Sequence, residues 1–437
     1  MESEIIGLIS LAAVIGLLLL RVPIAVALIA VSFVGISLIL GTKQAWGILS
    51  VIPYAFAAKW TLSSIPMFLL MGFMAHHGGL TAGLFSAARI WLSRLPGGLA
   101  VAAVLGCSGF AAVSGSSVAC AAAMGRISVP QMMKYNYSPS LATGAVAAGG
   151  TLGALIPPSI LLILFGIFTE TSINTLFIAS IGVGVASALA YILMIIIRVA
   201  INPELAPQVD DQPSWADKVA SLKEVWPVLI LFGVVLGGMF IGLFTATEAG
   251  AVGALMTIII SFFKKTLTFD AIKTTLVETL STTASLFFIA IGASFFIRFL
   301  TFSGADDLIS EIILQVGTDR LTLIFGMIGI YLFMGMFVDP LGTMLLTLPL
   351  VMPVLAQLDI SLIWFGVFLV KMLEIGMITP PVGLNVFVLK TVVDKSISLG
   401  TIFKGVMWFI AVDLLVVLFM VFVPQVVHFL PSLMITG

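Results

Sequence analysis

The chain has 437 residues, of which 61% are hydrophobic and only 9% are charged, and its mean hydropathy is +1.25. This balance excludes a soluble globular protein, and a formal net charge of −1 gives no polybasic surface for nucleic acid. Apolar runs of about 20 residues recur from end to end, so we predict an all-α polytopic membrane protein embedded in a lipid bilayer.

The N-terminal half, residues 1–201, consists of apolar spans joined by short connecting segments. We expect an amphipathic helix near 45–60 and a short helix after Gly79. His76 and His77 end one span and are interpreted as interfacial residues. The expected spans of this half lie near 5–20, 22–40, 64–77, 143–168 and 175–197.

Two segments of this half combine small or polar residues with an interrupted helix. The segment at about 97–128 has a turn-forming centre, GCSGFAAVSGSSVAC, which predicts a re-entrant hairpin. The span at about 143–168 contains a proline doublet, and proline removes a helix hydrogen bond. Na⁺ is a hard cation that prefers oxygen ligands such as hydroxyls and free carbonyls. Packing of small residues would explain an isolated SGSS, but a serine tip paired with a proline-broken span, and repeated in the second half, predicts an ion site. The residues concerned are Ser114, Ser116 and Ser117 at the tip, and Gly150, Thr151, Gly153, Pro157 and Pro158 at the break.

A polar stretch at about 202–225 is the predicted cytoplasmic linker between the halves, and features recur beyond it at an offset of roughly 220 residues. Basic residues flank the expected spans mostly on one side, which the positive-inside rule assigns to the cytoplasm. Each half then crosses the membrane an odd number of times, which predicts two inverted-topology repeats. The first hairpin enters from the cytoplasm, the second enters from outside, and both termini lie outside.

The C-terminal half, residues 226–437, repeats the hairpin and the broken span. The expected hairpin lies at about 320–356, and the expected broken span lies at about 361–390. Other spans are expected near 226–243, 246–263, 286–302 and 403–423, with an amphipathic helix near 270–285 and a short helix after Ala305. The residues of interest are Asp339, Gly342 and Thr343 at the tip, and Gly376, Thr379, Pro380, Pro381 and Asn385 at the break.

Charged residues inside apolar segments are functional candidates, because an ionisable group in a membrane is costly. The Asp339 carboxylate either neutralises a cation or holds the turn of the tip. Arg298 either clamps an anionic solute or snorkels to the outer interface. Glu248 begins a span and is expected opposite Arg298. Lys371 and Glu374 are spaced i, i+3 and are expected to pair with each other, whereas Asp413 receives no role.

Five motifs in one order carry a family resemblance. They are SGSSVA, GGTLGALIPPS, TATEAGAVGA, MFVDPLGTMLLTLPLVMP and GMITPPVGLNVFVLK. Together they resemble the large membrane subunit of tripartite ATP-independent periplasmic (TRAP) transporters, over nearly the whole chain. The resemblance implies a non-enzymatic, Na⁺-driven importer of organic acid anions, such as C4-dicarboxylates or sialic acid, in the bacterial inner membrane. It implies an elevator mechanism, a periplasmic binding protein and a small four-helix membrane subunit. It also places both termini in the periplasm.

The resemblance further implies two or more Na⁺ sites. One would use Ser114, Ser116, Gly150, Thr151 and Gly153, and the other would use Asp339, Gly342, Thr343, Gly376 and Thr379. The substrate would be bound between the tips, with Ser117, Asn385, Arg298 and Glu248 as candidates.

Three alternative functions are weighed against this interpretation. A standalone Na⁺/dicarboxylate symporter would work without a binding protein. An intramembrane enzyme such as a protease lacks support, because the chain has neither an HExxH motif nor a second aspartate suited to pair with Asp339. A channel fits less well than alternating access, since two hairpins from opposite faces meet at broken helices. The chain has no Walker A motif, so any uptake must draw on an ion gradient or a partner.

Overall fold

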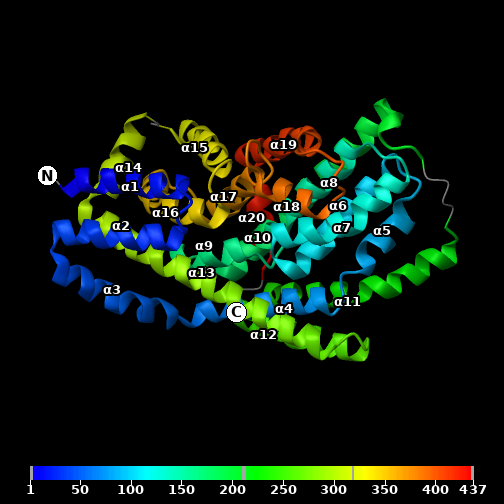
Figure 1. The fold of residues 1–437 in the computed structure, drawn as a ribbon, viewed down its shortest axis with the longest axis horizontal. Coiled ribbons are helices and arrows are strands. Elements are labelled where there is room, and N and C mark those ends of the chain that lie inside the picture. The colour runs from blue at the N-terminus through cyan, green and yellow to red at the C-terminus, as the bar shows by residue number, and fades with distance from the viewer. Residues whose placement is uncertain (1–2, 209–212, 317–318, 435–437) are drawn as a thin grey trace.

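The computed structural model describes residues 3–208, 213–316 and 319–434, and every regular element in these ranges is a helix (Figure 1). The first half contains α1 (Ser3–Leu19), α2 (Ile24–Ile39), α3 (Thr42–Ala57), η1 (Trp60–Ser63), α4 (Ser64–His77), α5 (Gly83–Leu92), α6 (Gly98–Ser114), α7 (Ser117–Lys134), α8 (Pro139–Thr151), η2 (Leu152–Ala154), α9 (Ile160–Thr169) and α10 (Ile173–Ile201). The second half contains η3 (Pro203–Leu205), α11 (Trp215–Phe240), α12 (Ala246–Phe263), α13 (Phe269–Ser303), α14 (Ala305–Val316), α15 (Arg320–Gly335), α16 (Pro340–Gln357), α17 (Leu362–Gly376), α18 (Leu384–Val392), α19 (Leu399–Phe422) and α20 (Gln425–Ser432).

The helices have the length and composition of a membrane protein, which confirms the predicted class. Among the described residues, six helices are long and apolar enough to cross a bilayer: α10, α11, α12, α13, α16 and α19. The pair α3 and α4, bent by 60°, adds a seventh if it counts as one span. Large apolar side chains also point outward, such as Leu193 (59% exposed) and Leu415 (64% exposed). Such side chains suit contact with lipid rather than with water.

Each half contains a helical hairpin and a broken helix, as the motifs predict. Hairpin 1 is the pair α6 and α7, and hairpin 2 is the pair α15 and α16. Break 1, at 155–159, separates α9 from α8 and η2, whereas break 2, at 377–383, separates α17 from α18. Hairpin 1 extends from the right-hand end of the molecule in Figure 1 and hairpin 2 from the left-hand end. Their opposite directions agree with the inverted pair of repeats that the charge pattern predicts.

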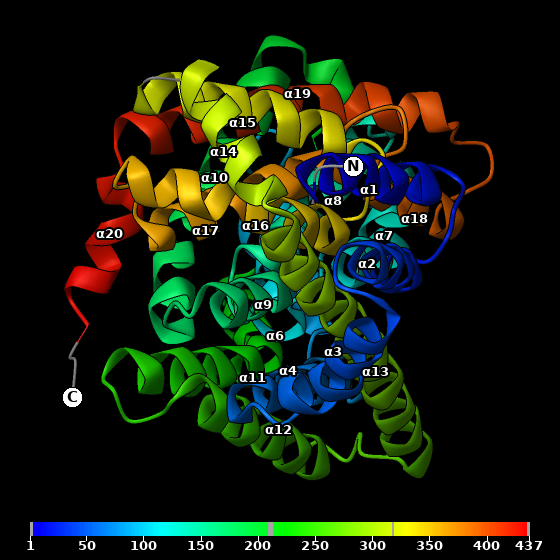
Figure 2. The same cartoon turned by 90° about the vertical axis from the view of Figure 1, so that its left-hand side faces the viewer.

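The helices form two groups when they are viewed along the long axis. In Figure 2, α3, α4, α11, α12 and α13 lie together on one side, whereas α8, α15, α17, α18 and α19 lie on the other. Helices α4, α12 and α13 pack on one another in the first group, and α8 packs on α19 in the second. We call the second group, together with α10, the two hairpins and the two breaks, the hairpin unit; within it, hairpin 1 also packs on α4 and α11 of the first group.

One predicted boundary is wrong. An amphipathic helix near 270–285 and a separate span near 286–302 were expected, but α13 runs unbroken through 35 residues from Phe269 to Ser303. The segment TLSTTASLFF contains no proline and no glycine, so nothing in it ends the helix. The lower hydropathy near residues 270–285 therefore reflects different surroundings of one part of the helix and does not mark a turn.

A buried polar network joins α8, α10, α17 and α19 and corrects the expected partner of Lys371. The Lys371 ammonium on α17 forms an ion pair with Asp413 on α19 and donates to Ser187 Oγ at 3.0 Å. Tyr191 OH on α10 lies 2.7 Å from each carboxylate oxygen of Asp413 and 3.3 Å from Thr151 Oγ1 at the end of α8. Lys371 and Asp413 are both fully buried. Lys371 therefore pairs with Asp413 and not with Glu374, because Lys371 faces α10 and α19.

We predict that Lys371→Met lowers the free energy of unfolding by about 3–5 kcal/mol, because it leaves the Asp413 carboxylate buried without its counter-charge. The double variant Lys371→Met/Asp413→Leu removes both charges and should be clearly more stable than the single variant. Unfolding of the three purified proteins in detergent, titrated with SDS, measures both effects. Equal stability of the single and double variants would show that the charges do not depend on each other.

Close backbone contact between α8 and α19 depends on two glycines. A Cβ atom on Gly144 would lie 2.6 Å from the carbonyl carbon of Gly405, which is closer than real Cβ contacts. We predict that Gly144→Ala destabilises the protein by about 1–3 kcal/mol, as overpacking does elsewhere. Gly233→Ala on α11 is the matched control, since a Cβ atom there meets nothing within 4 Å and alanine favours a helix. Thermal unfolding in detergent should place Gly144→Ala below the wild type and Gly233→Ala at or above it.

Candidate functional site

The tip of hairpin 1 lies directly against break 1. Gly115 has a left-handed backbone (φ 63°), and a Cβ atom there would lie 2.6 Å from the carbonyl oxygen of Pro158. Ser116 caps α7 by accepting a hydrogen bond from the Ala119 N–H at 3.4 Å. A Cβ atom on Gly153 would lie 2.9 Å from the Ser116 carbonyl. Only glycine permits this approach, so the sequence brings the carbonyl-rich break to the serine tip as predicted.

The tip of hairpin 2 meets break 2 in a similar way. Asp339 caps α16 by accepting the Gly342 N–H at 2.9 Å, so the carboxylate does hold the turn. A Cβ atom on Gly376, at the end of α17, would lie 2.6 Å from Gly335 Cα. Thr379 Oγ1 donates to the Ile375 carbonyl at 2.6 Å, which satisfies one of the last carbonyls of α17.

A contact between the halves joins the two sites, and the sequence did not reveal it. Ser117 Oγ on hairpin 1 donates to Glu374 Oε1 on α17 at 3.0 Å and lies 3.4 Å from Met377 Sδ. Glu374 is 1% exposed, and its side chain lies in the wall between the tips. The signal for this role was an acidic residue in an apolar segment, six residues before the second proline doublet.

These elements enclose a central cavity of about 260 Å³. Hairpin 1 contributes Ser116 and Ser117, hairpin 2 contributes Asp339, and α17 contributes Glu374. Helix α13 closes one side with Thr282 and Leu286. No lysine, arginine or histidine side chain lines this cavity, so its only formal charges among the described residues are two carboxylates.

Several buried polar atoms of this region have no hydrogen-bond partner among the described residues. They are Ser114 Oγ, Thr343 Oγ1, Glu374 Oε2, and both amide atoms of Asn385. Burying such a group unpaired costs free energy. Most of these atoms are oxygens, and oxygens are the ligands of hard cations. The site therefore has unused bonding capacity where a ligand would sit.

A larger cavity of about 690 Å³ adjoins the central one and shares Ser116, Ile160 and Thr282 with it. It extends past hairpin 1 to Arg126 and to the hydrogen-bonded pair His77 and Glu278, whose Nε2 and Oε2 atoms are 2.8 Å apart. His77 contacts Glu278 at the wall of this cavity, where the sequence predicted an interfacial residue. The cavity gives the central site a wide approach from the end at which hairpin 1 begins.

The structure places three other predicted residues away from the central cavity. Arg298 lines a separate cavity of about 210 Å³ beside Lys59 and Glu170. Glu248 is exposed and caps α12 through a reciprocal capping box with Thr245, and no described contact links it to Arg298. Thr151 bonds to the Ala148 carbonyl and belongs to the Asp413 network rather than to the tip.

Comparison with known proteins is consistent with this architecture. The sequence profile of the tripartite ATP-independent periplasmic transporter, DctM component, matches residues 11–426. The chain is 32% identical to the C4-dicarboxylate TRAP transporter large permease protein of Vibrio cholerae, covering 96% of both chains. It is 30% identical to the sialic acid TRAP transporter large permease protein of the same organism, covering 86% of this chain and 87% of that one. The fold is similar to that of the YdaH transporter from Alcanivorax borkumensis, with a TM-score of 0.60 at 16% identity and coverage of 87% and 89%. The chain thus belongs to the DctM family, the large permease component of TRAP transporters.

Proposed function

We propose that this permease takes up a small organic acid anion through the bacterial inner membrane and that Na⁺ drives the uptake. The observation that carries the proposal is the central cavity, which is lined by both hairpin tips and by residues at or beside both breaks, and in whose wall Glu374 Oε2 has no partner among the described residues. Relatives are named as transporters of C4-dicarboxylate, sialic acid and isethionate, which are all small organic anions. A periplasmic binding protein would deliver the solute, and a small membrane subunit would complete the tripartite assembly.

The charges of the cavity give a physical reason for cation coupling. Asp339 and Glu374 line it, and no cationic side chain does. Two like charges in a medium of low dielectric constant repel strongly, so a carboxylate solute entering alone would be repelled. Na⁺ bound at the tips would remove this repulsion, which makes the affinity for the solute depend on Na⁺. The cation is a co-substrate in this scheme, bound by hydroxyl, carbonyl and carboxylate oxygens around Ser114, Ser116 and Gly153, and around Asp339, Thr343 and Gly376.

Movement of the hairpin unit against the neighbouring helices would carry the site between the two sides of the membrane. The separation of the two helix groups in Figure 2 supports such an elevator. In the proposed orientation both termini are periplasmic, and the segment that joins α10 to α11 is cytoplasmic. The larger cavity then opens the site toward the cytoplasm.

We predict that vesicles containing this permease and its small subunit take up the solute only with an inward Na⁺ gradient and the solute-loaded binding protein. Radiolabelled uptake with K⁺ in place of Na⁺, and with the binding protein omitted, tests each requirement separately. Uptake that persists without the binding protein would instead identify a standalone symporter. Uptake that ignores the Na⁺ gradient would refute the coupling.

We predict that Glu374→Gln, which keeps the shape and removes the charge, raises the Na⁺ concentration for half-maximal uptake by about tenfold or more, because it removes a carboxylate that attracts the cation, and a loss of about 1.4 kcal/mol is tenfold in affinity. Glu204→Gln, at an exposed position in η3, is the charge-matched control and should behave as the wild type. Na⁺ titrations of uptake measure both variants. An unchanged Na⁺ dependence in Glu374→Gln, with the protein inserted normally, would remove Glu374 from the coupling site.

A further inference from the structure

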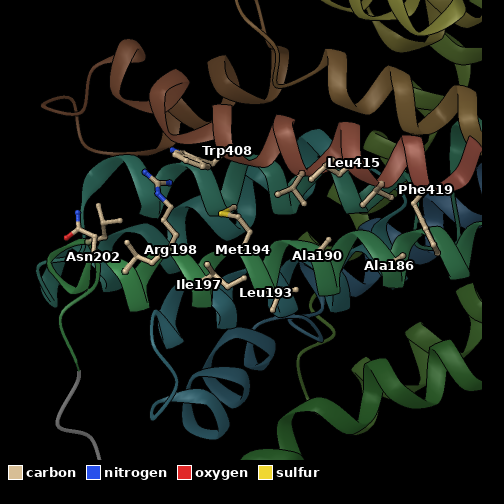
Figure 3. A pocket seen from close by; sticks show the side chains of 14 residues that line it. Ala186, Ala190, Leu193, Met194, Ile197, Arg198, Asn202, Trp408, Leu415 and Phe419 are labelled. Carbon is tan, nitrogen blue, oxygen red and sulfur yellow. The ribbon is translucent and has the colours of Figure 1, made fainter. Parts of the chain in front are cut away.

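A second large hollow lies on the outside of the hairpin unit, between α10 and α19 (Figure 3). It has a volume of about 830 Å³ and is lined almost wholly by apolar side chains, among them Leu193, Met194 and Phe419. Ala186 and Ala190 leave room between the helices. Both helices are candidate membrane spans, and Leu193 and Leu415 at its edges are about 60% exposed (59% and 64%). This groove therefore opens toward the hydrocarbon region of the bilayer.

The groove is polar at one end only. Figure 3 shows Arg198, Asn202 and Trp408 together at that end, with Ala186 and Phe419 at the other. From residue 186 to residue 202 is 16 residues, or about 24 Å of helix at 1.5 Å per residue. An apolar groove of that length with a basic residue at one end matches the length and polarity of a phospholipid that lies along the helices with its phosphate at Arg198.

Arg198 is placed to bind an anion that the described residues do not supply. Its guanidinium group lies over the Trp408 ring, 5.0 Å from the ring centroid. This contact fixes the orientation of the planar guanidinium. Its Nη1 atom is buried and has no hydrogen-bond partner among the described residues. Among the described residues, no aspartate or glutamate lines the groove, so none of them compensates the positive charge there. Arginine recognises phosphate through parallel hydrogen bonds, and basic pockets between transmembrane helices bind acidic headgroups.

We propose that one anionic phospholipid binds this groove, with its phosphate on Arg198 and an acyl chain between α10 and α19. A transmembrane helix of a partner is less suitable, because an anionic side chain that could pair with Nη1 is costly within a membrane span. A lipid acyl chain without an anionic headgroup would leave Arg198 Nη1 unpaired. The bound lipid would fill this groove on the outer surface of the hairpin unit.

Lipid titrations followed by native mass spectrometry of the purified permease test this proposal with phosphatidylglycerol and phosphatidylethanolamine as probes. The wild type should bind phosphatidylglycerol more tightly. Arg198→Gln should weaken that binding about tenfold or more, because it removes a charged donor pair. Lys404→Gln removes the same charge from α19 outside the groove, at an exposed position, and should have no effect.

The acyl-chain part of the site is tested independently of Arg198. Ala190→Trp fills the groove and should weaken phosphatidylglycerol binding, whereas Leu189→Trp, on the outward face of the same helix, should not. Phospholipids with brominated acyl chains should quench the fluorescence of Trp408. The difference in quenching between the wild type and Trp408→Phe measures this effect.

Four results would overturn the proposal. They are equal affinity of the wild type for the two lipids, equal binding by Arg198→Gln and Lys404→Gln, equal binding by Ala190→Trp and Leu189→Trp, and protection of Trp408 by the small membrane subunit in place of lipid. The last would identify the groove as a helix-docking surface. Because the first comparison needs no variant, misfolding of Arg198→Gln would not leave the proposal untested.

Discussion

A bilayer offers no hydrogen bonds to a broken backbone, and the whole arrangement of this permease follows from that constraint. Each proline doublet ends a helix inside an apolar segment and frees carbonyl groups that lipid cannot satisfy. Each break is therefore covered by protein, and the cover is the tip of a hairpin from the same half. Glycines let the backbone of the hairpin contact the backbone beside the break, at Gly115 against Pro158 and at Gly335 against Gly376. The central cavity lies between the two tips, and Glu374, whose Oε2 atom has no partner among the described residues, lies in its wall.

The same constraint governs the charges. Lys371 and Asp413 are fully buried but neutralise each other, and Tyr191 and Ser187 complete their hydrogen bonds. This pair is a closed structural element that needs no ligand. Glu374 lies one turn away from Lys371 on the same helix, yet only one of its oxygens has a partner. The contrast separates a carboxylate that holds helices together from one that faces a cavity with bonding capacity to spare.

The sequence predicted those features that are encoded locally. Proline doublets, glycine-rich tips and serine clusters fix helix ends whatever surrounds them, so the hairpins and breaks appear close to their expected positions. It failed where partners come from distant segments. The Lys371–Glu374 spacing suits a pair on one helix, but the partner of Lys371 is 42 residues away and that of Glu374 is 257 residues away. Arg298 seemed close to the tip in sequence, yet α13 continues as one helix and carries it to another cavity.

Helix α13 also links the site to the first group of helices, to which α13 itself belongs. It supplies Thr282 and Leu286 to the central cavity, and Thr282 and Glu278 to the larger one. The remaining wall of the larger cavity comes from α4 on one side and from hairpin 1 on the other. Any shift of the hairpin unit along α13 therefore changes the larger cavity, whose walls belong to both groups. The tips and breaks would keep their mutual contacts during that shift, because those contacts lie within one group. Alternating access requires a site whose binding residues keep their arrangement while the cavity that leads to the site changes.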